Sequence, residues 1–141
     1  MINKNILMTK EVYDQILDTI AVQPPETGGV LGRKNGIICK YLYDDNADIN
    51  QYRYVPNVEK INTILDQWLK DDIEFAGIIH SHPEDVNELS YADNHYARKI
   101  LQENRLEYVI FQLVVRKTFY MYLIKSNSIY QCGISVIDKI C

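Results

Sequence analysis

Cysteine is scarce in this sequence, and the cysteines that are present follow no pattern. Cys39, Cys132 and Cys141 stand apart, and none belongs to a Cys-x-x-Cys pair. Thiolate metal sites and redox motifs use closely spaced cysteines, and small secreted domains use an even set to form disulfides. We therefore expect free thiols in a reducing compartment, with neither a disulfide frame nor a thiolate metal site.

The sequence also lacks a long apolar run and an excess of basic residues. No stretch approaches the roughly 18 continuous apolar residues of a membrane span, and the first residues, MINKNILMTKEVYDQ, do not resemble a signal peptide. The 15 Lys and Arg against 19 Asp and Glu give a formal net charge of −4, whereas a nucleic-acid-binding face would be basic. We expect a cytoplasmic protein that binds neither a membrane nor nucleic acid.

Segments typical of linkers are absent as well. Only 6 glycines and 4 prolines are spread over the 141 residues, and we find no repeat or low-complexity tract. This length corresponds to one ordinary domain, which can bury a core of its own but is short for two. The sequence thus predicts a single domain over residues 1–141.

Three segments show the helical spacing of apolar residues. Residues 9–21 begin with Thr9, a candidate N-cap, and Pro24 and Pro25 follow them. Residues 57–70 start just after a proline, and residues 90–104 form a more polar helix. The apolar positions are Val12, Ile16, Leu17 and Ile20 in the first segment, Val58, Ile61, Ile64, Leu65 and Trp68 in the second, and Ala97, Ile100 and Leu101 in the third.

Short runs rich in β-branched and aromatic residues predict the strands. Residues 28–33 and 36–43 are expected to form a hairpin that turns at Lys34-Asn35-Gly36, and the polar stretch 44–50 leads to a short strand at 52–55. Further strands are predicted at 75–80, 107–115, 118–125 and 128–136. Helices interleaved with strands indicate an α/β fold, in which a mixed β-sheet is flanked by helices.

One stretch combines residue types that bind metals. His80 and His82 are two apart at the end of a predicted strand, so their side chains project to the same side, and Pro83 turns the chain away. Ser90 and Asp93 are three apart, on one face of the first turn of the next helix. Two imidazoles and one carboxylate leave the fourth position of a tetrahedral zinc open for water, as in catalytic sites.

Each of these features also has a simpler interpretation. An H-x-H pair at a strand end is often surface polarity, and Ser90-x-x-Asp93 before an apolar face resembles a capping box. Glu26 could be a solvated loop acid, and His95 could be a helix-surface residue or a spare ligand. Each feature is common by itself, but their coincidence at this spacing is rare and favours a metal site.

The sequence does not match three other metal-binding motifs. The HxHxDH motif of metallo-β-lactamase-type hydrolases requires Asp and His where this chain has Glu84 and Asp85. Zinc deaminases require H-x-E and a later Pro-Cys-x-x-Cys, but residue 82 is His and no paired cysteines follow. The HExxH motif of other zinc proteases is absent.

The residues that remain resemble the signature of the JAMM (JAB1/MPN/Mov34) metalloproteases, a distant Glu followed by H-x-H, seven residues and S-x-x-D. The matching positions here are Glu26, His80, His82, Ser90 and Asp93, without a gap or substitution. The run Glu-Thr-Gly-Gly-Val-Leu-Gly at 26–32 is particularly similar to the prokaryotic JAB branch. The resemblance implies one JAB/MPN-type domain with a cytidine-deaminase-like layering of sheet and helices.

The resemblance also implies a role for each residue. His80, His82 and Asp93 would bind Zn²⁺, Glu26 would act as general base and acid toward the attacking water, and Ser90 would help to hold the oxyanion of the tetrahedral intermediate. Family members without the ligands act as scaffolds, whereas this chain keeps the full set.

The family hydrolyses isopeptide or peptide bonds, often directly after the C-terminal glycines of ubiquitin or ubiquitin-like proteins. The implied substrate is the extended C-terminal tail of a ubiquitin-like or sulfur-carrier-like protein, and a ubiquitin-activating-type enzyme encoded nearby is an implied partner. We expect such a tail to add as a strand to an exposed sheet edge near the site. Two alternatives stay open: a non-catalytic binding module for such tails, and a small-molecule zinc amidohydrolase.

Overall fold

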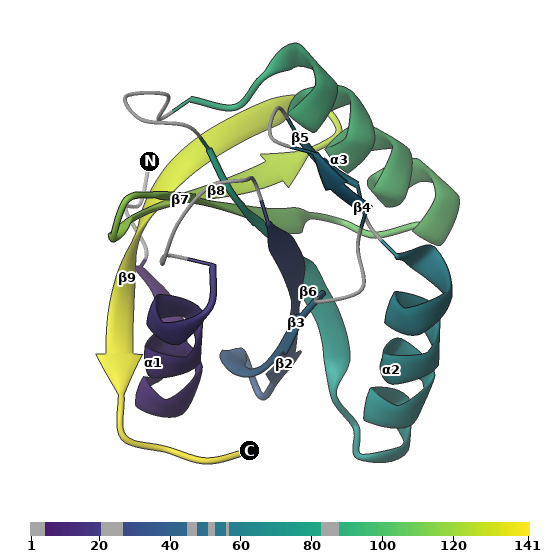
Figure 1. The fold of residues 1–141 in the computed structure, drawn as a ribbon. Helices are drawn as coiled ribbons and strands as arrows, with labels where there is room; N and C mark the ends of the chain where they lie inside the picture. Colours follow the sequence, from purple (N-terminus) through teal and green to yellow (C-terminus); the bar gives the residue numbers. More distant parts are fainter. Residues whose placement is uncertain (1–4, 21–26, 45–47, 51–52, 56, 83–87) are drawn as a thin grey trace.

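The computed structural model describes residues 5–20, 27–44, 48–50, 53–55, 57–82 and 88–141 (Figure 1). Its elements follow one another in this order: β1 (Asn5–Thr9), α1 (Lys10–Asp18), β2 (Gly28–Lys34), β3 (Ile37–Tyr43), β4 (Asp48–Asn50), β5 (Arg53–Val55), α2 (Val58–Lys70), β6 (Glu74–Ser81), α3 (Tyr91–Asn104), β7 (Val109–Val115), β8 (Thr118–Lys125) and β9 (Ser128–Ile137). Helices and strands thus interleave first, and a meander of strands ends the chain.

Seven of these strands form a mixed sheet in the order β1-β3-β2-β6-β7-β8-β9. The sheet closes into a barrel because β1 pairs in parallel with both β3 and β9. The β6–β7 pair is also parallel, and the other neighbours are antiparallel. The predicted mixed sheet with helices is confirmed. Its closure was not predicted, because β1 has only five residues and too short a pattern to identify.

The three predicted helices are present, and the predicted N-cap Thr9 caps the first of them. The Thr9 side chain accepts a hydrogen bond from the Val12 amide at 3.3 Å, and the Asn57 side chain accepts one from the Lys60 amide at 3.2 Å. The first helix ends at Asp18, earlier than predicted. In the described part of the chain, no helix has the length and apolar character required to cross a membrane.

The hairpin of β2 and β3 turns where the sequence predicts. Asn35 and Gly36 have φ angles of 54° and 78°, and two successive left-handed residues suit the tight turns that join antiparallel strands. The predicted strand at 52–55 is present as β5, which pairs with β4. The interpretation of 44–50 as a polar connection is therefore wrong for β4, because backbone pairing does not require an apolar pattern.

Two glycines of the 26–32 run allow β2 to lie close to its neighbours. A Cβ atom at Gly29 would overlap the carbonyl oxygen of Leu42 on β3, and one at Gly32 would lie 2.8 Å from the ring of Trp68 on α2. Small residues are therefore required on β2 for its approach to β3 and α2.

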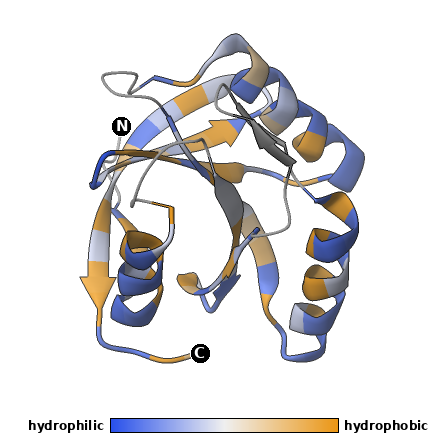
Figure 2. Ribbon diagram, viewed as in Figure 1, coloured by the Kyte–Doolittle hydropathy of each residue, from blue (hydrophilic) through white to orange (hydrophobic). Residues whose placement is uncertain are grey.

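Helices cover both faces of the sheet. Val12 and Ile16 of α1 pack in a buried cluster with Ile79 of β6, whereas Leu101 of α3 packs in a second cluster with the adjacent Ile78. Neighbouring residues of a strand point to opposite faces, so the two clusters lie on opposite sides of β6. The helices carry both hydrophobic and hydrophilic residues, as expected for elements between a sheet and solvent (Figure 2).

Gln112 of β7 is a polar exception in the core. It is 0% exposed and stands in register with Ile79 on one side and Met121 on the other. Within the described residues, neither its side-chain nitrogen nor its side-chain oxygen has a hydrogen-bond partner. A buried polar atom without a partner costs about 1–3 kcal/mol.

We expect Gln112→Met to raise the free energy of unfolding by about 1–3 kcal/mol, because methionine has a similar length and removes both unsatisfied atoms. The midpoint of thermal unfolding should rise by about 3 °C or more. Gln102→Met, at an exposed position of α3, is the control and should change stability by less than about 0.5 kcal/mol. Lower stability of Gln112→Met would mean that ordered water satisfies the amide.

The cysteines depart from the sequence-based expectation. Cys39 and Cys141 form a disulfide, with Cα atoms 5.6 Å apart and a sequence separation of 102, and Cys132 is free. The prediction of free thiols is therefore wrong for two of the three cysteines. The reason is topological: β1 pairs with both β3 and β9 and brings the chain after β9 next to Cys39, which no local spacing reveals.

Candidate metal centre

His80 is held at the end of β6 by neighbours on both sides. It stands in register with Gly28 of β2 and with Leu113 of β7. Its ring contacts the Phe111 ring in a T-shaped arrangement, with the centroids 5.2 Å apart. Its side chain is only 9% exposed. The imidazole is thus fixed by the sheet below it and by an aromatic neighbour beside it.

His82 lies just beyond the end of β6. Its backbone amide donates to the carbonyl oxygen of Val114 at 3.0 Å, which continues the pairing with β7. Between the histidines, Ser81 accepts a hydrogen bond from the Thr27 amide on its side-chain oxygen at 2.9 Å. The two imidazoles lie with their centroids 4.7 Å apart at an interplanar angle of 82°. The predicted projection of both histidines to one side is confirmed.

The N-terminus of α3 supplies the third residue of the site. Ser90 is the N-cap: its side-chain oxygen accepts from the Asp93 amide at 3.0 Å, and the Asp93 carboxylate accepts from the Ser90 amide at 2.9 Å. This is a complete capping box. The simpler interpretation of Ser90-x-x-Asp93 is therefore correct as a description of local structure.

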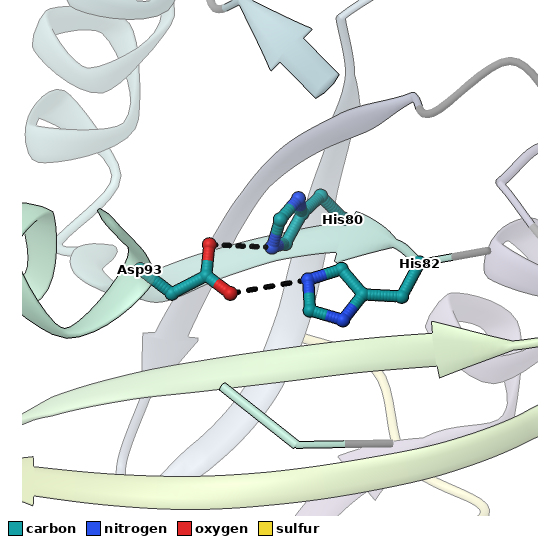
Figure 3. Close-up of side chains that lie close together, drawn as sticks. All are labelled: His80, His82 and Asp93. Carbon is teal, nitrogen blue, oxygen red and sulfur yellow. Dashed lines mark hydrogen bonds and ion pairs between the residues drawn. The ribbon is translucent and has the colours of Figure 1, made fainter. Parts of the chain in front are cut away.

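The same carboxylate also contacts both histidines. Asp93 Oδ1 lies 3.1 Å from His80 Nε2, and Oδ2 lies 3.1 Å from His82 Nε2 (Figure 3). The capping bond to the Ser90 amide fixes the carboxylate in this position. The cap and the metal site are thus not alternatives, because one side chain serves both.

The surroundings of Asp93 keep its carboxyl group ionised. Burial by itself would raise the pKa of this carboxyl group, but the interactions with His80 and then His82, together with the hydrogen bond from the Ser90 amide, hold the pKa well below its ordinary value. Asp93 is only 8% exposed. A buried, ionised carboxylate between two imidazole nitrogens is prepared to bind a cation.

The three residues fit a zinc ion. One ligand atom from each of His80, His82 and Asp93 lies within 4.8 Å of the others. Ligand atoms at about 2.0–2.1 Å from a tetrahedral zinc are separated by about 3.3 Å. Small side-chain adjustments therefore suffice to hold zinc, with a donor set of two nitrogens and one oxygen.

The other predicted site residues have different outcomes. Glu26 lies outside the described residues, so its role stays a prediction; the next residue, Thr27, is hydrogen-bonded to Ser81 at the end of β6. Ser90 accepts in the cap, but its hydroxyl proton is still able to donate. His95 is exposed, stacks on Tyr91 with the centroids 6.3 Å apart, and is not part of the metal-binding group.

Sequence reasoning missed the groups that position the site. The Phe111 ring against His80 and the Ser81–Thr27 hydrogen bonds come from distant parts of the sequence. The serine between the two histidines carried a signal, since alternation sends its side chain to the face of the sheet opposite to theirs.

The model of the family described as prokaryotic homologs of the JAB domain matches residues 9–127. No curated protein is significantly similar. The solution structure of protein DSY2949 from Desulfitobacterium hafniense is similar, with 17% identity and a TM-score of 0.74 over 95% of this chain and 94% of that one. The crystal structure of AF2198, a JAB1/MPN domain protein from Archaeoglobus fulgidus, has 13% identity and a TM-score of 0.56 over 96% and 99%. At these identities the two structures show a common fold.

Proposed function

Because this chain belongs to the family of prokaryotic homologs of the JAB domain, we propose that it is a zinc metallopeptidase. Its proposed substrate is the amide bond after the extended C-terminal tail of a ubiquitin-like or sulfur-carrier-like protein. The observation that carries the proposal is the convergence of His80, His82 and Asp93 within 4.8 Å. Two imidazoles and one carboxylate leave a coordination position for catalysis.

Each residue has a separate task in this proposal. His80, His82 and Asp93 would hold the zinc ion, which supplies Lewis-acid polarisation and a nucleophile near neutral pH. Glu26 would take the proton of the attacking water and give it to the leaving amine. The Ser90 hydroxyl, fixed at the start of α3 by its capping bond, would donate to the oxygen that becomes negatively charged.

The topology limits where an extended tail can bind. β6 has β2 on one side and β7 on the other, so its edge is not free. β4 and β5 pair only with each other in the described residues, and each leaves an edge. We propose that the tail pairs with a free edge of this hairpin and not with an edge of the main sheet.

The base of the hairpin supports this path. The Asp44 amide donates to the Gly28 carbonyl oxygen at 2.9 Å, and the Asn57 amide donates to the Asp44 carboxylate at 2.7 Å. Since Gly28 is the register partner of His80, both ends of the 44–57 segment are fastened one strand away from the metal centre. A tail on the hairpin would then run toward His80.

The test is cleavage of a ubiquitin-like domain whose tail ends in Gly-Gly and is joined to a reporter protein. We expect cleavage after the second glycine with zinc, loss of cleavage after chelation, and recovery when zinc is restored. Changing Gly-Gly to Val-Val should lower kcat/KM by about 100-fold, because added Cβ atoms displace the scissile bond from the catalytic groups.

The other outcomes separate the alternatives. Binding of the tail without cleavage in the presence of zinc would indicate a non-catalytic binding module. Turnover of small amides without any effect on the tailed protein would indicate an amidohydrolase. Equal cleavage of the Gly-Gly and Val-Val tails would contradict the passage of the tail close to the metal.

A further inference from the structure

A groove lies beside the metal centre on the face of the sheet that α3 covers. Its volume is about 360 Å³. Residues just before α3 and in its first turn form one side of the groove, and residues of β8 and β9 form the other. We call it the tyrosine groove; it is lined by Glu88, Leu89, Asn94, Tyr120, Tyr122, Ile129 and Gln131.

The sheet register fixes the position of this groove relative to the site. His80 of β6 is the partner of Leu113 of β7, and Leu113 is the partner of Tyr120 of β8. Residues directly opposite one another in neighbouring strands share a face. Tyr120 therefore lies on the same face as His80, two strands away, and strands are spaced by about 4.8 Å. The groove begins about 10 Å from the metal centre.

The lining includes two acceptor groups, on Asn94 and Glu88, beside the side chains of Gln131 and the two tyrosines, which can both donate and accept. The Asn94 side-chain nitrogen donates to the Ser90 carbonyl oxygen at 3.2 Å, whereas its side-chain oxygen is buried and has no partner among the described residues. Glu88 adds an exposed carboxylate. Among the described residues that line it, none is a lysine, arginine or histidine. The Asn94 oxygen and the Glu88 carboxylate are thus available to accept hydrogen bonds from a ligand.

The Glu88 carboxylate and the rings of Tyr120 and Tyr122 line the same groove. Burial raises the pKa of Tyr122, and the charge of Glu88 raises it further, as expected for a carboxylate close to the phenol. The rings of Tyr120 and Tyr122 present faces that attract cations. A carboxylate, an amide oxygen and two aromatic rings together favour a positively charged side chain.

We propose that the tyrosine groove binds a lysine or arginine side chain of the polypeptide substrate, about three residues away from the scissile bond. The spacing follows from the distance of about 10 Å and a rise of about 3.3 Å per extended residue. This inference rests on the proposed function, because it assumes that a polypeptide passes the metal centre. It assigns a substrate preference that the three metal ligands cannot provide.

The test uses glycine–alanine heptapeptides with one arginine or one glutamate, placed in turn at each position. They are titrated into the ¹⁵N-labelled protein without metal, so that binding is measured independently of hydrolysis. We expect the arginine peptide to bind roughly five- to tenfold more tightly than the glutamate peptide, with NMR shifts at β8 residues. Glu88→Gln should abolish the difference, and Glu88→Lys should reverse it.

Glu103→Gln is the matched control, because Glu103 is an exposed carboxylate at the far end of α3 and does not line the groove. It should keep the arginine preference. In a cleavable substrate, arginine three residues from the scissile bond should lower KM with little change in kcat. Equal binding of the two peptides, or a preference that survives Glu88→Gln, would overturn the assignment.

The two proposals fail separately. Cleavage of tailed substrates without any charge preference would contradict the groove and leave the metallopeptidase intact. Charge-dependent binding through Glu88 without hydrolysis by the zinc-loaded protein would contradict the metallopeptidase and leave the groove as a binding site for basic peptides.

Discussion

Replacing Glu26 by glutamine is expected to lower kcat by about 10²- to 10⁴-fold, the range that general acid–base catalysis contributes. The variant should still bind one zinc per chain, because the proposed ligands are His80, His82 and Asp93. Glutamine has nearly the same shape as glutamate but cannot accept the proton of the attacking water. Zinc content by mass spectrometry and single-turnover cleavage of the tailed fusion measure the two properties.

Glu11→Gln is a suitable control, since Glu11 is an exposed acid in the first turn of α1. It should change neither zinc content nor kcat. Full activity of Glu26→Gln would show that another residue is the base. Loss of zinc from that variant would show that Glu26 is a ligand and not a base.

The Asp93 carboxylate both accepts the capping hydrogen bond from the Ser90 amide and contacts the two histidines. Different substitutions of Asp93 can therefore separate its contribution to stability from its contribution to zinc binding. We expect both Asp93→Asn and Asp93→Ala to lower zinc affinity by more than about 100-fold, which exceeds the loss typical of a group that only supports a ligand. The side-chain oxygen of asparagine can still accept from the Ser90 amide and keep this half of the capping box, whereas alanine removes that hydrogen bond and costs about 1 kcal/mol in stability. Zinc titration and urea unfolding of the metal-free proteins distinguish the two effects.

Ser90→Ala serves as the converse control, since it removes one half of the capping box and leaves all three proposed ligands. It should lower stability by about 1 kcal/mol and retain most of the zinc affinity. If Asp93→Asn left the zinc affinity unchanged, Asp93 would not be a zinc ligand and its role would be limited to capping α3. The depressed pKa of Asp93 also stabilises the folded state above the ordinary carboxyl pKa, and this stability is lost as the pH falls through the folded-state pKa.

The elements of the fold were predictable where the signal is local. Thr9 and Asn57 cap helices whose apolar residues repeat at helical spacing, and Asn35-Gly36 marks a tight turn. The family resemblance is confirmed as well. β4 was missed because it has only three residues in a polar stretch, and β1 was missed because it is short and is stabilised by pairing with distant strands. Barrel closure and the Cys39–Cys141 disulfide follow from that pairing and have no local signature.

The cluster of His80, His82 and Asp93 was predictable because its geometry is also local. Alternation along β6 places His80 and His82 on one side, and the first turn of α3 places Asp93 next to them. The sequence could not show that the capping bond and the contacts to the histidines share one carboxylate. It also could not show the tyrosine groove, whose lining combines residues 88–94 with strands about 30 residues later.

The central claim is that His80, His82 and Asp93 hold one zinc ion. Its most direct test is a crystal structure of the zinc-soaked protein with anomalous diffraction data on both sides of the zinc absorption edge. We expect one peak per chain, bonded to a ring nitrogen of each histidine and to an Asp93 oxygen at about 2.0–2.2 Å. A zinc peak elsewhere, with Asp93 hydrogen-bonded to the Ser90 amide and turned away from both histidines, would contradict the claim.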